Sequence, residues 1–395
     1  MKQIILLVSI FCFMPFMHAQ KDTEPITKIP FELEGNHIFI QLKIEESESL
    51  EFVFDTGAGG TVINTTTAEK LGLIASKTSE NTGASGKVIT KIIKNSQIRI
   101  KTIKLDKIDL QSAPLSHLEE KFGRNLDGII GYDFLKKYVV EIDYDDFELV
   151  VFKAKNFKYQ GDGEMVKIDL GNVPTAVFPI ALKEGRYIKE EFILDNGAGL
   201  ALAFTSPFSK RNNLRSSIGK TYPNNASGFS SNVANVYVGK IHKLKILDYE
   251  YANIPASIYN TDVGVFANEV IAGVIGNEIL KKFNITFDYK RKRSYWELND
   301  RFLNEAFEIS HSGLKLKLNS DRSKIIVDYI IPKSEVANSK LKVGDEIIEI
   351  DNVKTSNTSL TQLRKLLHQD GKVITIKFKQ DHQVQEVTIH LKPLI

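Results

Sequence analysis

The chain has 395 residues, a formal net charge of +3, 42% hydrophobic residues and 26% charged residues. A single hydrophobic core stops growing at roughly 250–300 residues, so this length predicts two or three domains. The apolar content excludes an intrinsically disordered chain, and the small net charge without a concentrated basic face argues against a nucleic-acid-binding protein.

The first 19 residues have the pattern of a secretory signal peptide. Lys2 precedes an apolar run from Ile4 to Met17, and His18-Ala19-Gln20 is a plausible cleavage site. We therefore expect a signal peptide at 1–19 and an exported protein, periplasmic or extracellular. No later segment approaches the roughly 20 apolar residues of a membrane span. The alternative to a cleaved signal peptide is an uncleaved N-terminal anchor. The one cysteine, Cys12, lies in this segment, so the mature chain would lack disulfides and a cysteine nucleophile.

Two sequence motifs occur twice, in the same order and at nearly the same spacing. FVFDTGAG at 52–59 recurs as FILDNGAG at 192–199, and GIIGYDFLKKY at 128–138 recurs as GVIGNEILKKF at 273–283. Such self-similarity is the signature of a duplicated unit. We therefore expect two homologous lobes, at residues 25–155 and 156–300.

Within each copy the pattern is mainly that of β-strands. Residues 38–44 largely alternate between apolar and polar side chains, which is the period of a half-buried strand. The helical signals are short, at Thr66–Leu71 and Tyr132–Tyr138. The basic run 290–293 lies between two apolar segments, so we interpret it as the exposed turn of a hairpin.

The repeated motif ends an apolar strand in an Asp-x-Gly turn, which places a carboxyl group at a sharp bend. Glycine in that turn lets a second backbone approach closely. Two such turns can bring Asp55 and Asp195 within hydrogen-bonding distance, where like charges cannot both ionise and the pair shares one proton. The ionised partner can take a proton from water while the protonated partner polarises a peptide carbonyl.

In these motifs the chain resembles the aspartic peptidases, specifically the retropepsin-like families and their two-lobed pepsin-fold relatives, over roughly residues 30–300. The resemblance implies a mainly β, two-lobed, closed-barrel fold with Asp55 and Asp195 as the catalytic dyad, water as the nucleophile and no cofactor. Ala58 and Ala198, where pepsins usually carry serine, indicate the retropepsin side. Both aspartates are in one chain, so an oligomer is not required.

The resemblance also assigns residues around the dyad. The residues expected to support the two aspartate loops are Thr56, Gly57, Asn196, Gly197, Gly131 and Gly276. The flaps that would close over a peptide substrate are expected at Gly83, Ala84, Ser85 and Gly86 and at Ala226, Ser227 and Gly228. The alternative for both flap segments is an ordinary surface turn.

Asn196 departs from the family pattern, which has Thr or Ser at this position. The hydroxyl normally bonds across the junction between the lobes, and the longer amide of Asn can still donate and accept. We expect it to replace the hydroxyl imperfectly and to weaken the junction. The alternative function is a noncatalytic pseudopeptidase that binds peptides, or a scaffold, on the same fold.

Residues 306–395 fall outside the repeat and resemble a bacterial PDZ domain, a small α+β fold. The most specific element is Lys342-Val343-Gly344-Asp345, followed by an apolar alternating strand. The resemblance implies that a peptide C-terminus binds beside a helix at Leu360–His368. Its carboxylate loop would be Gly313, Leu314, Lys315 and Leu316. Lys315 replaces a small residue there, and the alternative is a docking module without a ligand.

Other chemistries lack their motifs in this sequence. The eight histidines are scattered and form no His-Glu-x-x-His helix, and no Gly-x-Ser-x-Gly elbow or P-loop occurs. We therefore expect neither a metal nor a cofactor. The sequence predicts an exported aspartic endopeptidase acting on peptide or protein substrates, with a PDZ-like domain for recruitment.

Overall fold

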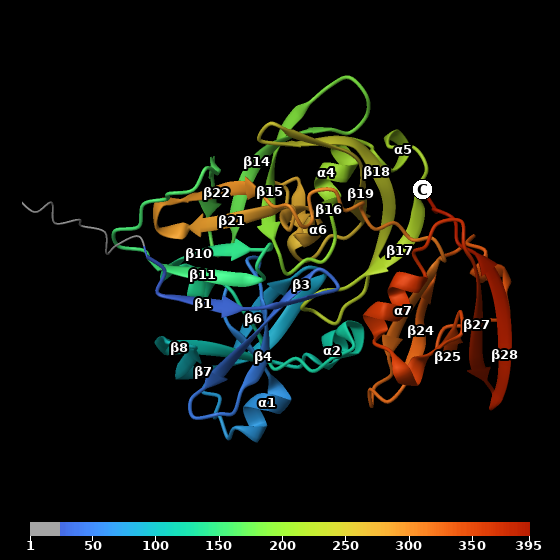
Figure 1. Ribbon diagram of the computed structural model, residues 1–395, viewed down its shortest axis with the longest axis horizontal. Coiled ribbons are helices and arrows are strands. Elements are labelled where there is room, and N and C mark those ends of the chain that lie inside the picture. The colour runs from blue at the N-terminus through green and yellow to red at the C-terminus, as the bar shows by residue number, and fades with distance from the viewer. Residues whose placement is uncertain (1–23) are drawn as a thin grey trace, which may run out of the picture.

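The structure is a computed structural model that describes residues 24–395 (Figure 1). The predicted signal peptide, 1–19, lies outside the described residues. The fold is mainly β and has two similar lobes followed by a small C-terminal domain. The predicted fold class is therefore confirmed. Within residues 24–395, no helix is long and apolar enough to cross a membrane.

The first lobe is one sheet closed on itself. Its strands are β2 (Glu32–Glu34), β3 (His37–Ile44), β4 (Leu50–Phe54), β5 (Val62–Asn64), β6 (Lys77–Gly83), β7 (Gly86–Ile100), β8 (Ile103–Ala113) and β9 (Gly128–Ile130). Because β3 pairs with both β4 and β7, the strands β3, β4, β9, β5, β8 and β7 form a closed barrel. The helices are α1 (Thr65–Lys70), α2 (Ser116–Phe122) and α3 (Tyr132–Leu135).

The second lobe repeats this topology. Its strands are β13 (Asp169–Leu170), β14 (Pro174–Ala181), β15 (Ile188–Asp195), β16 (Leu202–Phe204), β17 (Tyr222–Ala226), β18 (Ala234–Ile246), β19 (Tyr249–Tyr259) and β20 (Gly273–Gly276). The pairing of β14 with β18 closes this barrel as β3 and β7 close the first. Its helices are α4 (Ser206–Arg211), α5 (Leu214–Ser217), α6 (Asn277–Leu280) and the 3₁₀ turn η1 (Val265–Ala267).

A third sheet joins the lobes. Its strands, in order, are β1 (Thr27–Pro30), β11 (Glu148–Lys153), β10 (Tyr138–Asp143), β21 (Phe283–Asp288), β22 (Arg293–Leu298) and β12 (Glu164–Lys167). The lobes meet where β10 pairs with β21, with Glu141 opposite Thr286. The predicted basic hairpin turn is confirmed, since the 3₁₀ turn η2 (Tyr289–Arg291) connects β21 to β22.

The aspartate strands are β4, which directly precedes Asp55, and β15, which ends at Asp195. Their successive side chains alternate between two apolar environments. Phe52 and Phe54 are fully buried in the main core, and Val53 between them belongs to a separate cluster. In lobe 2, Phe192 lies in the main core and Ile193 lies in another cluster. Each aspartate strand therefore anchors itself in its barrel with one face, as the period-two pattern of a strand requires.

The C-terminal domain has its own core. Its elements are β23 (Leu314–Leu318), β24 (Ile325–Ile330), the 3₁₀ turn η3 (Val336–Asn338), β25 (Glu346–Ile350), β26 (Val353–Lys354), the 3₁₀ turn η4 (Thr355–Asn357), α7 (Leu360–Leu366), β27 (Val373–Gln380) and β28 (Gln383–His390). A capping box of Ser359 and Gln362 starts α7, which satisfies otherwise unpaired backbone N–H groups.

This domain is firmly attached to the lobes. Phe302 and Phe307 in the connecting segment pack against the main core, and Leu394 and Ile395 pack against a lobe-2 cluster. Lys240 Nζ donates to Ile395 O at 2.9 Å. The two ends of the domain are therefore both held by the preceding lobes.

Candidate active site

Asp55 follows β4 directly and is held by the neighbouring strand β9. The strands run parallel, and Asp55 N–H donates to Ile130 O at 2.9 Å. A Cβ on Gly131 would lie 2.0 Å from Asp55 O, so only glycine fits there. Lobe 2 repeats the arrangement where Asp195 ends β15 beside Gly276, whose Cβ would lie 2.1 Å from a backbone oxygen.

The two aspartates face each other across the lobe junction. A Cβ on Gly57 would lie 2.4 Å from Asp195 Cγ, and one on Gly197 would lie 2.2 Å from Asp55 Cγ. Each carboxyl group therefore lies against the glycine of the opposite loop. Gly57 N–H donates to Asp55 Oδ1 at 2.7 Å, and Ala198 N–H donates to Asp195 Oδ1 at 3.0 Å.

Thr56 and Asn196 connect the two loops through a reciprocal set of buried hydrogen bonds. Thr56 Oγ1 donates to Leu194 O at 2.8 Å and accepts from Asn196 N–H at 3.0 Å. Asn196 Nδ2 donates to Phe54 O at 3.2 Å, and its Oδ1 accepts from Thr56 N–H at 2.6 Å. The amide therefore makes the same two contacts as the hydroxyl, and the expectation of an imperfect replacement is wrong.

The electrostatics of the pair follow from enclosure and proximity. Both residues are partly exposed as a whole, but their carboxyl groups are enclosed between the loops. Burial, followed by the charge of Asp195, raises the pKa of Asp55 well above its ordinary value, and burial raises the pKa of Asp195. Two carboxylates this close resist ionising together, so the pair retains one proton to a higher pH than an isolated aspartate would.

The residues predicted as flaps lie at the tips of two hairpins that meet. Strands β6 and β7 turn at Ala84 and Ser85, and residues 227–233 connect β17 to β18. A Cβ on Gly83 would lie 3.1 Å from Ser230 N, so the first tip touches the second loop. Gly86 follows the first tip, and Ala226 ends β17, so all seven predicted residues fall in or beside these turns.

An apolar cluster of each lobe borders the aspartate loops. The lobe-1 apolar cluster consists of Phe39, Val53, Val62, Ala113, Leu115, Leu118, Leu126 and Ile129, with Ala58 and Phe122 packed against it. The lobe-2 apolar cluster includes Ile193, Val274, Tyr259 and Phe266, and Ala84 of the first hairpin tip packs against it. Each cluster therefore reaches its aspartate loop, through Ala58 in lobe 1 and Ala198 in lobe 2.

Sequence reasoning missed a further contact between the lobes, made by Asn36. Asn36 Nδ2 donates to Gly199 O at 3.1 Å, and Lys281 Nζ donates to Asn36 Oδ1 at 2.8 Å. His37 lies beside the same loop, and burial lowers its pKa to about 4, so it is neutral near pH 7. The available signal was the Gly35-Asn36 pair, which is typical of a tight turn but does not reveal what the turn contacts.

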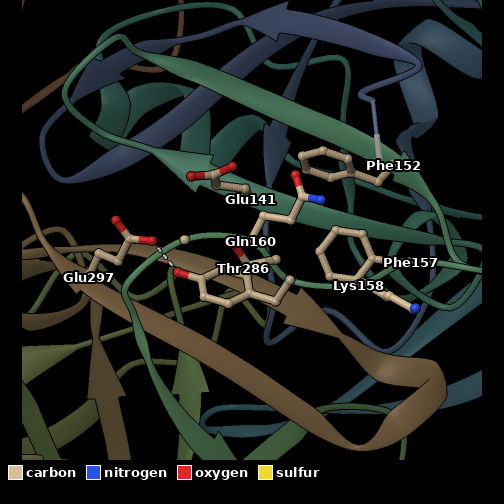
Figure 2. A pocket seen from close by; sticks show the side chains of 9 residues that line it. Glu141, Phe152, Phe157, Lys158, Gln160, Thr286 and Glu297 are labelled. Atoms are coloured by element: carbon tan, nitrogen blue, oxygen red, sulfur yellow. Dashed lines mark hydrogen bonds between the residues drawn. The ribbon is translucent and has the colours of Figure 1, made fainter. Parts of the chain in front are cut away.

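The cavity in Figure 2 lies at the sheet that joins the lobes, and neither Asp55 nor Asp195 lines it. Its volume is about 220 Å³, and its lining includes Glu141, Phe157, Tyr159 and Glu297. Tyr159 Oη donates to Glu297, and burial raises the pKa of Glu141 to about 7. Among residues 24–395, no group of three or more His, Cys, Asp or Glu side chains is arranged to hold a metal ion.

Comparison with known families agrees with this architecture. Residues 40–134 match the aspartyl protease family, and residues 306–379 match the PDZ domain family. The chain therefore contains an aspartyl protease domain and a C-terminal PDZ domain, as predicted. The first match includes Asp55 and Gly131 and ends before lobe 2, so it does not cover Asp195. No curated protein matches the chain.

Proposed function

We propose that this chain, with its aspartyl protease and PDZ domains, is an exported aspartic endopeptidase that uses Asp55 and Asp195 to activate water. The observation that carries the proposal is their reciprocal placement, with each carboxyl group against the glycine of the opposite loop. Export is inferred from the first 19 residues. The substrates would be peptides or proteins, because the PDZ domain is a peptide-binding type and the two apolar clusters suit peptide side chains.

The chemistry needs one proton on the aspartate pair. The ionised carboxylate takes a proton from water as the water oxygen attacks the peptide carbonyl carbon, and the protonated carboxyl donates its proton to the carbonyl oxygen. The resulting gem-diol collapses when one hydroxyl returns its proton to the pair and the pair gives a proton to the peptide nitrogen. The C–N bond then breaks, and the pair again holds one proton.

A noncatalytic peptide-binding protein is the second candidate. Phe229 from the loop between β17 and β18 packs against the lobe-1 apolar cluster, so a side chain from lobe 2 covers part of the cluster that borders the Asp55 loop. A protein that bound peptides without cleaving them could tolerate such an arrangement permanently.

Cleavage of a mixed peptide library at several pH values, with and without a pepstatin-type inhibitor, tests the proposal. We expect inhibitor-sensitive cleavage that is lost in both Asp55→Asn and Asp195→Asn. Full activity in the Asp195→Asn variant would refute the two-aspartate mechanism. Peptide binding without cleavage at any pH would support the second candidate.

A further inference from the structure

The face of the PDZ domain formed by β23 and α7 is covered by helix α2 of the first lobe (Figure 1). Arg364 of α7 donates through Nη2 to Leu316 O of β23 and to Lys121 O of α2, both at 2.7 Å. A Cβ on Gly123, directly after α2, would lie 2.9 Å from Leu360 Cβ. The face to which the resemblance assigns a peptide is therefore occupied by this chain's own helix.

The predicted carboxylate loop is also engaged within the chain. Gly313 N–H donates to Ser310 Oγ at 3.2 Å, and Leu314 N–H donates to Ser312 Oγ at 3.1 Å. Lys315 Nζ donates to Asn225 O at 2.7 Å and to Asn225 Oδ1 at 3.1 Å. In this structure the loop is therefore not arranged to capture a free carboxylate. Its lysine holds lobe 2 instead.

The contacts of α2 and Lys315 converge on one segment of lobe 2, residues 225–230, which we call the retained loop. Lys121 Nζ donates to Ser227 Oγ, and His117 Nε2 donates to Gly228 O at 3.1 Å. Together with Lys315 on Asn225, three side chains from outside lobe 2 hold this loop. Because two of them come from α2, a shift of α2 would release most of the retained loop's anchors.

The retained loop carries Phe229 to the lobe-1 apolar cluster beside the Asp55 loop. Its side chain packs against the lobe-1 apolar cluster, which contains Val53 and Ile129 and is flanked by Ala58 of the aspartate loop. Phe229 comes from lobe 2, so it crosses the junction to reach this surface. An apolar side chain of a bound peptide near Asp55 would need the same surface.

We propose that the PDZ domain is an internal lock on the active site, which holds the retained loop between the lobes by binding α2 and Asn225. Phe229 then blocks the lobe-1 apolar cluster until the PDZ domain separates from α2. This inference rests on the proposed function for its effect on catalysis, but the mechanical link between the PDZ domain and the loop does not. The rate on a peptide falls in proportion to the fraction of molecules in which the loop is retained.

Two ion pairs at the contact allow it to be opened without touching the loop. Lys317 of β23 pairs with Glu120 at 2.8 Å, and Arg322 pairs with Glu119 at 2.9 Å. In K317E/R322E both attractions become repulsions between α2 and the PDZ domain. Lys324→Glu is the matched control, because Lys324 pairs with Glu346 at 2.9 Å inside the PDZ domain.

The experiment measures hydrogen exchange at residues 225–232 and kcat/KM on a short peptide in the full chain. In K317E/R322E we expect exchange in this segment to become at least about fivefold faster and kcat/KM to rise by at least about fivefold. The Lys324→Glu control should change neither. Phe229→Ala, which leaves the PDZ contacts in place, should also raise kcat/KM, so the proposal is testable even if the double variant does not fold.

Unchanged exchange at 225–232 in folded K317E/R322E would overturn the lock. Faster exchange with a lower kcat/KM would overturn it too, because the contact would then support the site. Failure of the proposed function gives a different result from failure of the lock. If the proposed function is wrong, neither the wild type nor any variant cleaves the peptide; if the lock is wrong, hydrogen exchange at residues 225–232 does not become faster in K317E/R322E.

Discussion

The reciprocal hydrogen bonds of Asn196 make a quantitative prediction about the lobe junction. Asn196→Ala removes the donor to Phe54 O and the acceptor for Thr56 N–H, both in a buried setting. A buried polar group left without a partner costs about 1–3 kcal/mol. Two such groups, with some relaxation, should lower the free energy of unfolding by about 2–4 kcal/mol.

Asn196→Thr is the variant to compare with Asn196→Ala. In the lobe-1 loop, the single hydroxyl of Thr56 makes the two equivalent contacts to lobe 2: it donates to Leu194 O and accepts from Asn196 N–H. A threonine at 196 can make the mirror-image pair, so we expect its stability to lie within about 1 kcal/mol of the wild type.

Equilibrium unfolding in urea, followed by circular dichroism with the exposed Asn304→Ala as control, measures these differences. Chains of several domains can unfold in steps, so the transition that responds to Asn196→Ala must be compared between variants. The reasoning is refuted if Asn196→Ala is as stable as the control, because the junction would then not depend on the amide.

Four further predictions follow from the same structure. Asp55→Asn and Asp195→Asn should each abolish cleavage without unfolding the chain, and the wild type should show a bell-shaped pH profile in kcat/KM; its alkaline limb should lie above the ordinary aspartate pKa, because burial raises the pKa of both residues. Gly197→Ala should abolish activity in the same assay, because its Cβ would lie 2.2 Å from Asp55 Cγ; retained activity would mean that the loops rearrange easily. Glu278 is buried, which raises its pKa to about 8. Between about pH 4 and pH 8 its carboxyl group is therefore protonated in the folded protein and ionised in the unfolded chain, so the free energy of unfolding falls as pH rises through this range. Denaturation curves should show a flatter fall for Glu278→Gln, which we expect to stabilise the protein at pH 8 by about 1–3 kcal/mol. A chain that ends near residue 300 should melt at a lower temperature than one that ends near residue 312. The shorter chain lacks Phe302 and Phe307 and the carbonyl groups to which Lys282 Nζ donates. Equal melting temperatures would mean that the connecting segment does not stabilise the lobes.

The repeated motifs were sufficient to predict the architecture and the aspartate loops. An apolar strand that ends in Asp-x-Gly has few structural solutions, and its second copy with the same downstream glycine element predicts two similar lobes. Gly131 and Gly276 are constrained by backbone oxygens of their own lobes, whereas Gly57 and Gly197 are constrained by the aspartate of the opposite lobe. The motifs that carry these glycines are short-range sequence patterns, which is why the sequence alone could locate them.

The effect of Asn196 on the lobe junction could not be predicted from its residue type. Asn differs from Thr in length and in hydrogen-bonding groups, but its contribution depends on where Phe54 O and Thr56 N–H lie. Those positions are set by how the two lobes dock. The sequence showed a departure from the family, and the structure showed that the departure is compensated.

The sequence by itself determined the class of fold, the duplicated lobes, the aspartate pair and the PDZ domain. Only the tertiary structure decided that the PDZ face binds helix α2 and that Phe229 crosses from lobe 2 into the lobe-1 apolar cluster. A lone phenylalanine in a polar loop was the one visible signal, and it does not name its partner. The physical reason is that motifs record constraints among neighbouring residues, whereas docking between domains depends on the shape and charge of surfaces that form only after each domain has folded.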